Sequence, residues 1–504
     1  MVGGARMDVE AANAAAALQP GETSGERRSR LLSGMADGSL AATGLTRLDL
    51  SGLDLAELPD GIGTLSTLQF LNLGKNPLSA LPATFVGLTS LRILFFLGCE
   101  FTAVPELLGR MPSLYMLSFK ANKVREVPAA SLSPTLGWLI LSDNQIERLP
   151  DTIGACVGMR KLLLAGNRLT SEGLPESMAN MRQLELLRLA DNRLDRVPGW
   201  ILSHPTLAWV ALAANPATAP WAESAEARAA ATVAEGGGAV EVPEVAFHSL
   251  GVDASDVPLG SGASGAVYAG QLDGAPAAVK VYSNGAKTSD GRPQDEMAAS
   301  VLASRTGCRS IVRSVARFVR AAPGAREGAA EGLVMEFLSP NEWASLGGPP
   351  SFDTVTRDTY PPGTSRTAAE VIAVARGVAA AAAALHASGV MHGDLYAHNT
   401  LFRSSVVAAA LLPPTVPAAK LGDFGAAFFY PPGSDVGREL ERAEVRAYGI
   451  MLKELLAAHD RVEGAAGGVM MEEVAALAEV CVGARESRPS FTEIVARVGS
   501  PEGV

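Results

Sequence analysis

The sequence predicts a multidomain α/β protein, in which an N-terminal solenoid of short repeats precedes a separate C-terminal α+β domain. Two observations lead to this prediction. A leucine pattern recurs about every 23 residues through residues 45–220, and the chain beyond it holds an ordered series of glycine, lysine, aspartate and asparagine motifs. The chain has 504 residues, and at roughly 150 residues per domain this length accommodates two or more domains.

The repeat has the form LxxLxLxxN, and the last residues of successive copies lie 22 to 25 residues apart. A proline follows each copy. Each copy supplies a short strand whose leucines point inward. Because one copy cannot bury its apolar face alone, the copies must stack into a curved solenoid. The copies are Leu45–Leu53, Leu68–Asn76, Leu91–Cys99, Leu114–Asn122, Leu136–Asn144, Met159–Asn167, Leu184–Asn192 and Leu207–Asn215.

This pattern resembles the leucine-rich-repeat family, in its short intracellular form. The resemblance implies that the asparagine of each copy hydrogen-bonds the backbone of the neighbouring turn. Cys99 stands in one asparagine place, and we expect it to be structural and unreactive.

The chain around the repeats divides into three further segments. Residues 1–44 are rich in Ala, Gly and Ser, which predicts a disordered or capping leader before the repeat domain of residues 45–220. Residues 221–246 are rich in Ala, Glu and Gly, which predicts a linker. Residues 247–504 form the second domain.

Charge and cysteine content limit the partners and the compartment. The formal net charge of −11 argues against a nucleic-acid or anionic-membrane partner. The four cysteines are scattered without ligand-like spacing, which favours a reducing, cytoplasmic location. No membrane span is predicted, because the most apolar stretch, residues 371–390, is interrupted by Arg376 and His386 and is expected to be a buried helix.

The second domain opens with a glycine-rich motif of the form GxGxxGxV. A dinucleotide-binding fingerprint would open a helix at this point. Here the glycines are followed by residues with strand character, a turn, and a second strand with Lys280 at its centre. The motif consists of Gly260, Ser261, Gly262, Ala263, Ser264, Gly265, Ala266 and Val267.

Five further landmarks follow in a fixed order. They are Glu296 on a predicted helix, the strand and hinge Leu333–Leu338, the loop His392–Asn399, the triplet Asp423–Gly425, and the sequence Arg488–Phe491. Together with the glycine motif they resemble the protein-kinase family over about residues 250–500. The resemblance implies a two-lobed fold that uses ATP and Mg²⁺.

The resemblance also implies how ATP is held. The glycine loop covers the phosphates, and Lys280 contacts them while pairing with Glu296. The residues expected around adenine are Met335, Glu336 and Leu338.

The remaining implied roles belong to the phosphoryl transfer. Asp394 accepts the proton of the substrate hydroxyl. Asn399 and Asp423 supply oxygen ligands to Mg²⁺.

The chain departs from the kinase pattern in its catalytic loop. Gly393 replaces the arginine that receives a phosphorylated activation loop. Tyr396 stands where serine/threonine kinases carry lysine, and His398 stands where tyrosine kinases carry arginine, so neither position declares a substrate class.

Two departures lie outside that loop. The activation segment has only 18 residues between Gly425 and Glu444 and lacks an APE motif, so Arg488 is expected to meet Glu439 or Glu441 instead. An apolar insertion, about residues 404–419, is expected within a hairpin.

The main prediction is an ATP- and Mg²⁺-dependent protein kinase acting on a protein substrate, with serine/threonine favoured and the repeats used for recognition or regulation. One alternative is a catalytically weak pseudokinase scaffold acting through its repeats. Another is a small-molecule phosphotransferase of the aminoglycoside or choline kinase kind, which also uses an HGD loop and lacks APE. The glycine loop, the Lys280 strand and the Arg488–Phe491 ending favour the protein-kinase interpretation.

The third position of each repeat faces the concave side of the solenoid. Strands roughly 4.8 Å apart would align these side chains in one column. A long apolar column often marks a binding face, so we predict a protein ligand, or the chain's own kinase domain, on its apolar members. The alternative is that they only shield one another. The column is Arg47, Phe70, Ile93, Met116, Trp138, Lys161, Leu186 and Trp209.

Overall fold

The computed structural model describes residues 19–234, 242–253, 256–262, 264–283, 290–319, 331–403, 417–458 and 468–499. The chain forms two compact units. The first holds the residues up to Leu187 together with Asn192–Trp200, and the second holds Arg188–Asp191 together with the chain from Ile201 onward. These units differ from the predicted boundaries at 220 and 247, because the last repeat belongs to the second unit.

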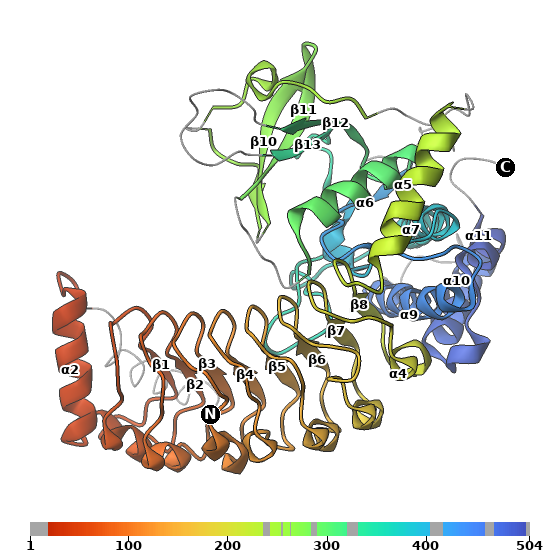
Figure 1. Ribbon diagram of the computed structural model, residues 1–504. Helices are drawn as coiled ribbons and strands as arrows, with labels where there is room; N and C mark the ends of the chain where they lie inside the picture. Colours follow the sequence, from red (N-terminus) through yellow and green to blue (C-terminus); the bar gives the residue numbers. More distant parts are fainter. Residues whose placement is uncertain are drawn as a thin grey trace. The chain divides into compact units, whose positions relative to one another are not determined.

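The repeats form a parallel sheet of eight three-residue strands in chain order (Figure 1). Each strand is short because only the centre of LxxLxLxxN is extended, and its middle residue points into the core: Leu71 and Leu139 are fully buried. The predicted solenoid is therefore confirmed. The strands are β1 (Arg47–Asp49), β2 (Phe70–Asn72), β3 (Ile93–Phe95), β4 (Met116–Ser118), β5 (Trp138–Ile140), β6 (Lys161–Leu163), β7 (Leu186–Arg188) and β8 (Trp209–Ala211).

In the repeats of the first unit, a short helical turn begins directly after the proline that follows each strand. Pro59, Pro82 and Pro150, for example, each stand directly before a 3₁₀ helix in extended conformation. Proline suits this place because its fixed φ and missing N–H fit the residue that enters a helix. These turns are η1 (Asp60–Thr64), η2 (Ala83–Gly87), η3 (Glu106–Arg110), η4 (Ala129–Ser131), η5 (Asp151–Ala155) and η6 (Glu176–Asn180), followed by the helix α4 (Gly199–Ser203).

The repeat asparagines form a ladder of buried hydrogen bonds. Asn144 accepts from the backbone N–H of Val124 at 3.0 Å and donates to the carbonyls of Phe119 and Leu141, each at 2.9 Å. Cys99, in its asparagine place, donates Sγ–H to the Leu73 carbonyl at 3.3 Å. Burial raises the pKa of this thiol, which agrees with an unreactive, structural cysteine.

The predicted concave column lies in register, but most of its apolar members are buried. Phe70 pairs with Ile93, and Ile93 with Met116. Trp138 is only 9% exposed, and Lys161 Nζ lies 4.2 Å from the centre of its ring. The expectation of an open apolar column is therefore wrong for Met116, Trp138 and Leu186. Trp209, also buried, stacks on Tyr396 of the second unit, which is the contact with the chain's own second domain given as the other expectation. Phe70 and Ile93 are half-buried.

The leader contains two helices, α2 (Ser24–Ala36) and α3 (Ser39–Ala42). Thr23 and Glu26 form a capping box that starts α2, and the apolar side chains Leu31 and Met35 are buried. This part of residues 1–44 is thus a packed helix rather than a disordered tail, and residues 1–18 lie outside the described chain.

The predicted linker, residues 221–246, is helical over its first part. The helix α5 (Ala219–Ala234) lies beside α6 (Pro293–Arg305) (Figure 1). Ala225 is buried in a core cluster with Ala299, Ala303 and Phe424. The Ala and Glu content that suggested a flexible linker also favours helix, and packing against α6 within the second unit stabilises it. Residues 235–241 lie outside the described chain.

A five-stranded antiparallel sheet follows, in the order β12-β13-β11-β10-β9. Its core holds Val279, Phe318 and Val334. The glycine motif joins β9 to β10, the first two strands of this sheet in chain order, as predicted. The elements here are η7 (Phe247–Leu250), β9 (Gly260–Ser261), β10 (Gly265–Leu272), β11 (Ala275–Tyr282), β12 (Ser314–Val319) and β13 (Glu331–Glu336).

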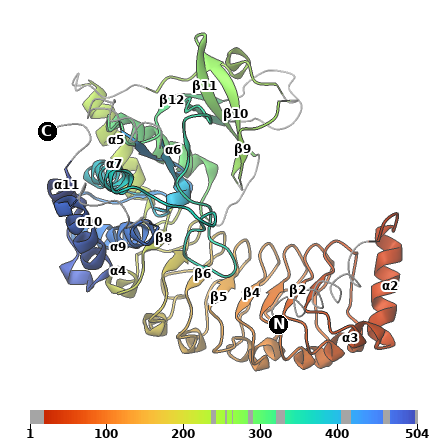
Figure 2. The same ribbon diagram turned by 180° about the vertical axis from the view of Figure 1, so that it is seen from behind.

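The rest of the second unit is mainly helical, with short strand pairs around its catalytic motifs; Figure 2 shows these helices from behind. The helices are α7 (Ala368–Ala387), η8 (Ala397–Asn399), α9 (Asp435–Ala457), α10 (Gly468–Val482), η9 (Arg485–Ser487) and α11 (Phe491–Val498). The strands are β14 (Ala344–Ser345), β15 (Val390–Met391), β16 (Thr400–Phe402), β17 (Ala419–Leu421) and β18 (Phe428–Phe429).

The expected hairpin is formed by β16 and β17. Most of the insertion predicted between these strands, residues 404–416, lies outside the described chain.

The helix α7 is long and apolar enough to cross a membrane, and it is the one such helix among the described residues. Its most apolar window is 56% buried inside the protein. It packs against α9, α11 and β17, in the manner of a core helix.

Replacing Asn144 with alanine removes a side chain that joins two successive repeats. Because Val124 N–H and two carbonyls lose their partner, we expect Asn144→Ala to lower the free energy of unfolding by about 3 kcal/mol. Chemical denaturation of the full chain measures this. Asn180→Ala, at the exposed end of η6, serves as the control and should change stability by less than about 0.5 kcal/mol. If both variants lowered the free energy of unfolding equally, the hydrogen bonds of Asn144 would not stabilise the repeats as described.

Glu454 on α9 gives stability a dependence on pH. Burial, with the nearby Asp358 carboxylate, raises the pKa of Glu454 from 4.5 to about 7. The folded state therefore holds the proton more tightly than the unfolded state, and stability falls as pH rises from about 4.5 to about 7. Glu454→Gln removes this loss and can still accept from the Tyr360 hydroxyl, which lies 3.1 Å away.

We expect Glu454→Gln to gain about 2 kcal/mol relative to the parent chain between about pH 4 and about pH 8. Denaturation at both pH values measures the gain. Glu472→Gln, on the exposed side of α10, should leave the pH dependence unchanged. If the free energy of unfolding changed with pH in the same way in the parent chain and in Glu454→Gln, the raised pKa of Glu454 would be refuted.

Candidate active site

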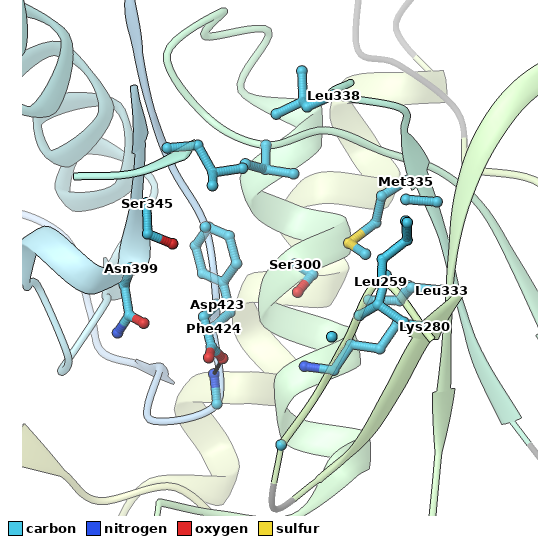
Figure 3. A pocket seen from close by; sticks show the side chains of 18 of the residues that line it. Leu259, Lys280, Ser300, Leu333, Met335, Leu338, Ser345, Asn399, Asp423 and Phe424 are labelled. Atoms are coloured by element: carbon cyan, nitrogen blue, oxygen red, sulfur yellow. Dashed lines mark hydrogen bonds between the residues drawn. The ribbon is translucent and has the colours of Figure 1, made fainter. Parts of the chain in front are cut away.

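A cavity of about 650 Å³ lies within the second unit, between the five-stranded sheet and the helical part. This volume falls in the range of small-molecule and cofactor sites. Thirteen of the predicted site residues line it: Gly260, Ser261, Gly262, Ser264, Gly265, Val267, Lys280, Glu296, Met335, Glu336, Leu338, Asn399 and Asp423. Ala263 lies outside the described chain. Figure 3 shows Lys280 and Asp423 on opposite walls of the cavity.

Lys280 and Glu296 form a buried ion pair. Lys280 stands at the centre of β11, opposite Val267 of β10, and Glu296 lies in the first turn of α6, which begins at Pro293. Lys280 Nζ donates to Glu296 Oε1. Burial raises the pKa of Glu296, and the Lys280 charge opposes that shift. The pair fixes one lysine charge on the cavity wall.

Asp423 presents its carboxylate to the cavity from a strained backbone. Its φ of +57° lies in the left-handed region, which is uncommon for a residue other than glycine and costs conformational energy. The backbone N–H of Gly425 donates to Asp423 Oδ1 at 3.3 Å. The next residue, Phe424, is buried in the core beside Ala299 of α6 and Ala225 of α5. This packing holds the unusual turn.

The catalytic loop is held by the carboxylate of Glu444, which lies on α9 and is fully buried. It accepts from the backbone N–H groups of His392, at 3.1 Å, and Gly393, at 2.6 Å. It also accepts from His386 Nε2 at 2.8 Å. Burial alone would raise the pKa of Glu444, but these partners, led by His386, lower it, so the carboxylate is ionised. Glu444 thus fixes the start of the catalytic loop to α9.

Asp394 lies at the end of this loop and has partners on both carboxylate oxygens. Asn399 Nδ2 donates to Oδ2 at 2.8 Å, and Arg188 Nη2 donates to Oδ1. Burial would raise the pKa of Asp394, but Arg188, His398 and His392 outweigh it, and the pKa is lowered. Its side chain keeps 20% exposure. It is not among the residues that line the cavity; it lies next to Asn399, which does.

Two residues that contact this site were missed by the sequence reasoning, namely Arg188 and Asp290. Arg188 ends β7, and its Nε donates to Asp290 Oδ1 at 2.7 Å, while Asp290 lines the cavity. Positions three and five of LxxLxLxxN alternate around a buried leucine, so both face the concave side. A second column through position five would have drawn attention to Arg188, which is its only basic member. Asp290 precedes Gly291 in an unpatterned stretch and carries no sequence signal.

The closing region of the domain uses a different arginine from the one expected. Arg485, not Arg488, pairs with Glu439, at 2.8 Å. Glu441 accepts from the backbone N–H of Phe491 at 2.7 Å. Arg488 donates to backbone carbonyls, including that of Pro205 at 2.6 Å. The prediction for Arg488 was therefore wrong, because its guanidinium donates to the backbone carbonyls of Arg442, Gly483 and Pro205 rather than to a glutamate.

Comparisons with known proteins agree with this architecture. A family model described as a leucine-rich repeat region matches residues 43–129, and one described as protein tyrosine and serine/threonine kinase matches residues 254–433. The fold and these matches define the class: a protein that joins leucine-rich repeats to a kinase domain. The chain thus combines a leucine-rich-repeat region with a protein-kinase domain.

Individual relatives resemble only parts of the chain. Human leucine-rich repeats and immunoglobulin-like domains protein 1 is 31% identical over 33% of this chain and 16% of its own length. The probable inactive serine/threonine-protein kinase roco10 of Dictyostelium discoideum is 30% identical over 26% of this chain and 5% of its own length. A solved leucine-rich-repeat protein of Leptospira interrogans is 24% identical, with a TM-score of 0.30, over 40% of this chain and 66% of that one. The chain thus spans a small part of the first two proteins.

Replacing Glu444 with glutamine tests its hold on the catalytic loop. The amide offers one acceptor oxygen where the carboxylate serves three donors, so buried donors lose their partner. We expect Glu444→Gln to lower the free energy of unfolding by about 3 kcal/mol, measured by chemical denaturation. Glu441→Gln, on the same helix, is the matched control, because its single acceptor role suits an amide oxygen. Comparable stability of the two variants would contradict this account.

Proposed function

We propose that the protein is an ATP- and Mg²⁺-dependent protein kinase that transfers phosphate to serine or threonine hydroxyls. One observation carries the proposal: the cavity gathers the Lys280–Glu296 pair, Asn399 and Asp423, with Asp394 hydrogen-bonded to Asn399 at its edge. Phosphoryl transfer depends on positioning and on charge neutralisation, and these are the groups that provide both.

The chain's own residues divide the work between two walls. On the sheet side, the glycine loop between β9 and β10 covers phosphate oxygens with backbone N–H groups, and the Lys280 ammonium contacts them. Met335, Glu336 and Leu338, where β13 leads out of the sheet, hold the adenine ring. On the helical side, Asp394 accepts the proton of the substrate hydroxyl, while Asn399 fixes its carboxylate.

The donor set near Asp423 fits Mg²⁺. This ion prefers oxygen ligands and is usually held by one or two protein groups together with phosphate oxygens. The Asp423 carboxylate faces the cavity, and Asn399 turns its amide nitrogen toward Asp394, which leaves its side-chain oxygen for a metal. Among the described residues, no cluster of three or more His, Cys, Asp or Glu would hold a metal unaided. When bound, ATP supplies the phosphoryl group and Mg²⁺ neutralises its charge.

The catalytically weak scaffold remains the second candidate. It is favoured by the name of one relative, a probable inactive kinase. The proposal is supported against it by Lys280, Asn399 and Asp423, which line one cavity, and by Asp394, which is hydrogen-bonded to Asn399. A small-molecule acceptor is favoured by the short segment between Gly425 and α9, whose residues Ala426–Tyr430 are buried and leave little loop for an extended peptide.

The repeats supply a surface for a protein partner in this proposal. Trp209 is excluded from that surface, because it stacks on Tyr396 with ring centres 4.2 Å apart. The half-buried members Phe70 and Ile93 remain at the N-terminal end of the column. A cytoplasmic location belongs to the same proposal and is supported by four free cysteines.

Asp394→Asn tests the proposed activity. The amide cannot accept the hydroxyl proton, so we expect phosphate transfer from labelled ATP, with Mg²⁺ and a generic protein substrate, to fall by about 100-fold or more. Binding of ATP, measured by calorimetry, should persist. Asp353→Asn, at an exposed loop position, should transfer normally. If the parent chain bound ATP but transferred phosphate to no substrate, the scaffold would be favoured. If it transferred phosphate only to small hydroxyl compounds, a small-molecule phosphotransferase would be favoured.

A further inference from the structure

A turn of the repeat region is built into the catalytic loop, within the second compact unit. It comprises Arg188–Asp191 and the chain from Ile201 through β8 to Asn215. Trp209 of β8 is 1% exposed, stacks on Tyr396 with an interplanar angle of 3°, and donates Nε1–H to the Leu395 carbonyl at 2.9 Å. The loop and the repeat turn thus share a packed contact.

Gly393 makes this close contact possible. It has φ +73°, and a Cβ atom on it would lie 2.5 Å from the carbonyl oxygen of Val210 in β8. The same atom would lie 2.6 Å from the Ala426 carbonyl oxygen. Any other residue would clash with both backbones, so the glycine in the catalytic loop is the one residue that admits β8.

With β8 packed against Gly393, the side chain of Arg188 reaches Asp394. Its guanidinium is 3% exposed and makes three donations: to Asp394 Oδ1, to the Gly393 carbonyl at 2.8 Å, and to Asp290 Oδ1 at 2.7 Å. A buried guanidinium is costly unless each donor finds an acceptor, and its planar fork holds a carboxylate in one orientation.

The charge balance of the site explains why a cation is useful there. Burial raises the pKa of Asp290, Arg188 opposes that shift, and the Asp394 and Asp423 carboxylates add to it. Three carboxylates therefore share this region, and a nucleotide would add further negative charge. Lys280 is already paired with Glu296. The loop between Asp394 and Asn399 contains no lysine or arginine.

We propose that Arg188, carried by the leucine-rich repeats, is a positioning residue of the kinase site, orienting the Asp394 carboxylate toward the acceptor hydroxyl. The inference rests on the proposed function. Arg188 takes one oxygen and Asn399 the other, and each oxygen keeps a further lone pair for the incoming proton. The segment Arg188–Asp191, which belongs to the second unit, therefore completes the active site.

The test compares Arg188→Gln, Arg188→Ala and Arg188→Lys with the parent chain in the full-length protein. Arg193→Gln, at an exposed repeat position five residues further on, is the control. Measured quantities are kcat, KM for ATP with Mg²⁺, and the thermal midpoint. We expect Arg188→Gln to lose about 100-fold in kcat, as for a misplaced catalytic group, with KM for ATP within about threefold. Arg188→Lys should recover part of the rate, and low-millimolar methylguanidinium should partly restore Arg188→Ala.

Four results would overturn the inference. Unchanged kcat in Arg188→Gln would show that Asp394 needs no such partner. A higher kcat would show that Arg188 restrains the site. Loss of activity with a lowered thermal midpoint, without rescue by lysine or methylguanidinium, would make the residue merely structural. A parent chain as inactive as Asp394→Asn would refute the proposed function itself, and this inference with it.

Discussion

The geometry of the catalytic loop depends on one buried carboxylate, that of Glu444. Its two oxygens collect the backbone N–H groups of His392 and Gly393 and the imidazole of His386. Because these donors come from α7 and from the loop, the helix α9 locks both to itself through a single side chain. The position of Asp394 follows from this, since it is the next residue along the constrained backbone.

Two aspartates near this anchor, Asp423 and Asp394, are held in place by different kinds of contact. The Asp423 turn is held by hydrophobic packing of Phe424 against α5 and α6. The Asp394 loop is held by ionic and polar contacts, from Glu444 on one side and Arg188 on the other. The two aspartates are thereby fixed independently.

Sequence patterns predicted whatever is set by local periodicity or by contiguous motifs. The LxxLxLxxN copies gave the strands and their register because burial of the middle leucine leaves no freedom of phase. The cavity residues from Gly260 to Asp423 could be placed because each sits inside a short recognisable string. What failed depended on contacts between distant segments. The stretch that forms α5 suggested a linker, since a packing partner, Ala299, lies more than 70 residues beyond Ala225. Arg188 was missed because the repeat motif leaves its position variable, and Asp290 was missed because it belongs to no motif. Arg485 displaced Arg488 for the same reason, since the partner backbone comes from residues 204–206.

The division of the chain into units has a consequence for how such a protein can arise by recombination. A genetic breakpoint placed in the alanine-rich stretch after residue 220 would look neutral, because it separates the repeats from the kinase motifs. Such a breakpoint would nonetheless transfer a catalytic loop without the strand β8, against which Gly393 packs. Asp394 in that loop would also lose its partner Arg188. An exchange that keeps the site whole must carry the last repeats with the kinase, so the inherited module is larger than the kinase motifs alone suggest.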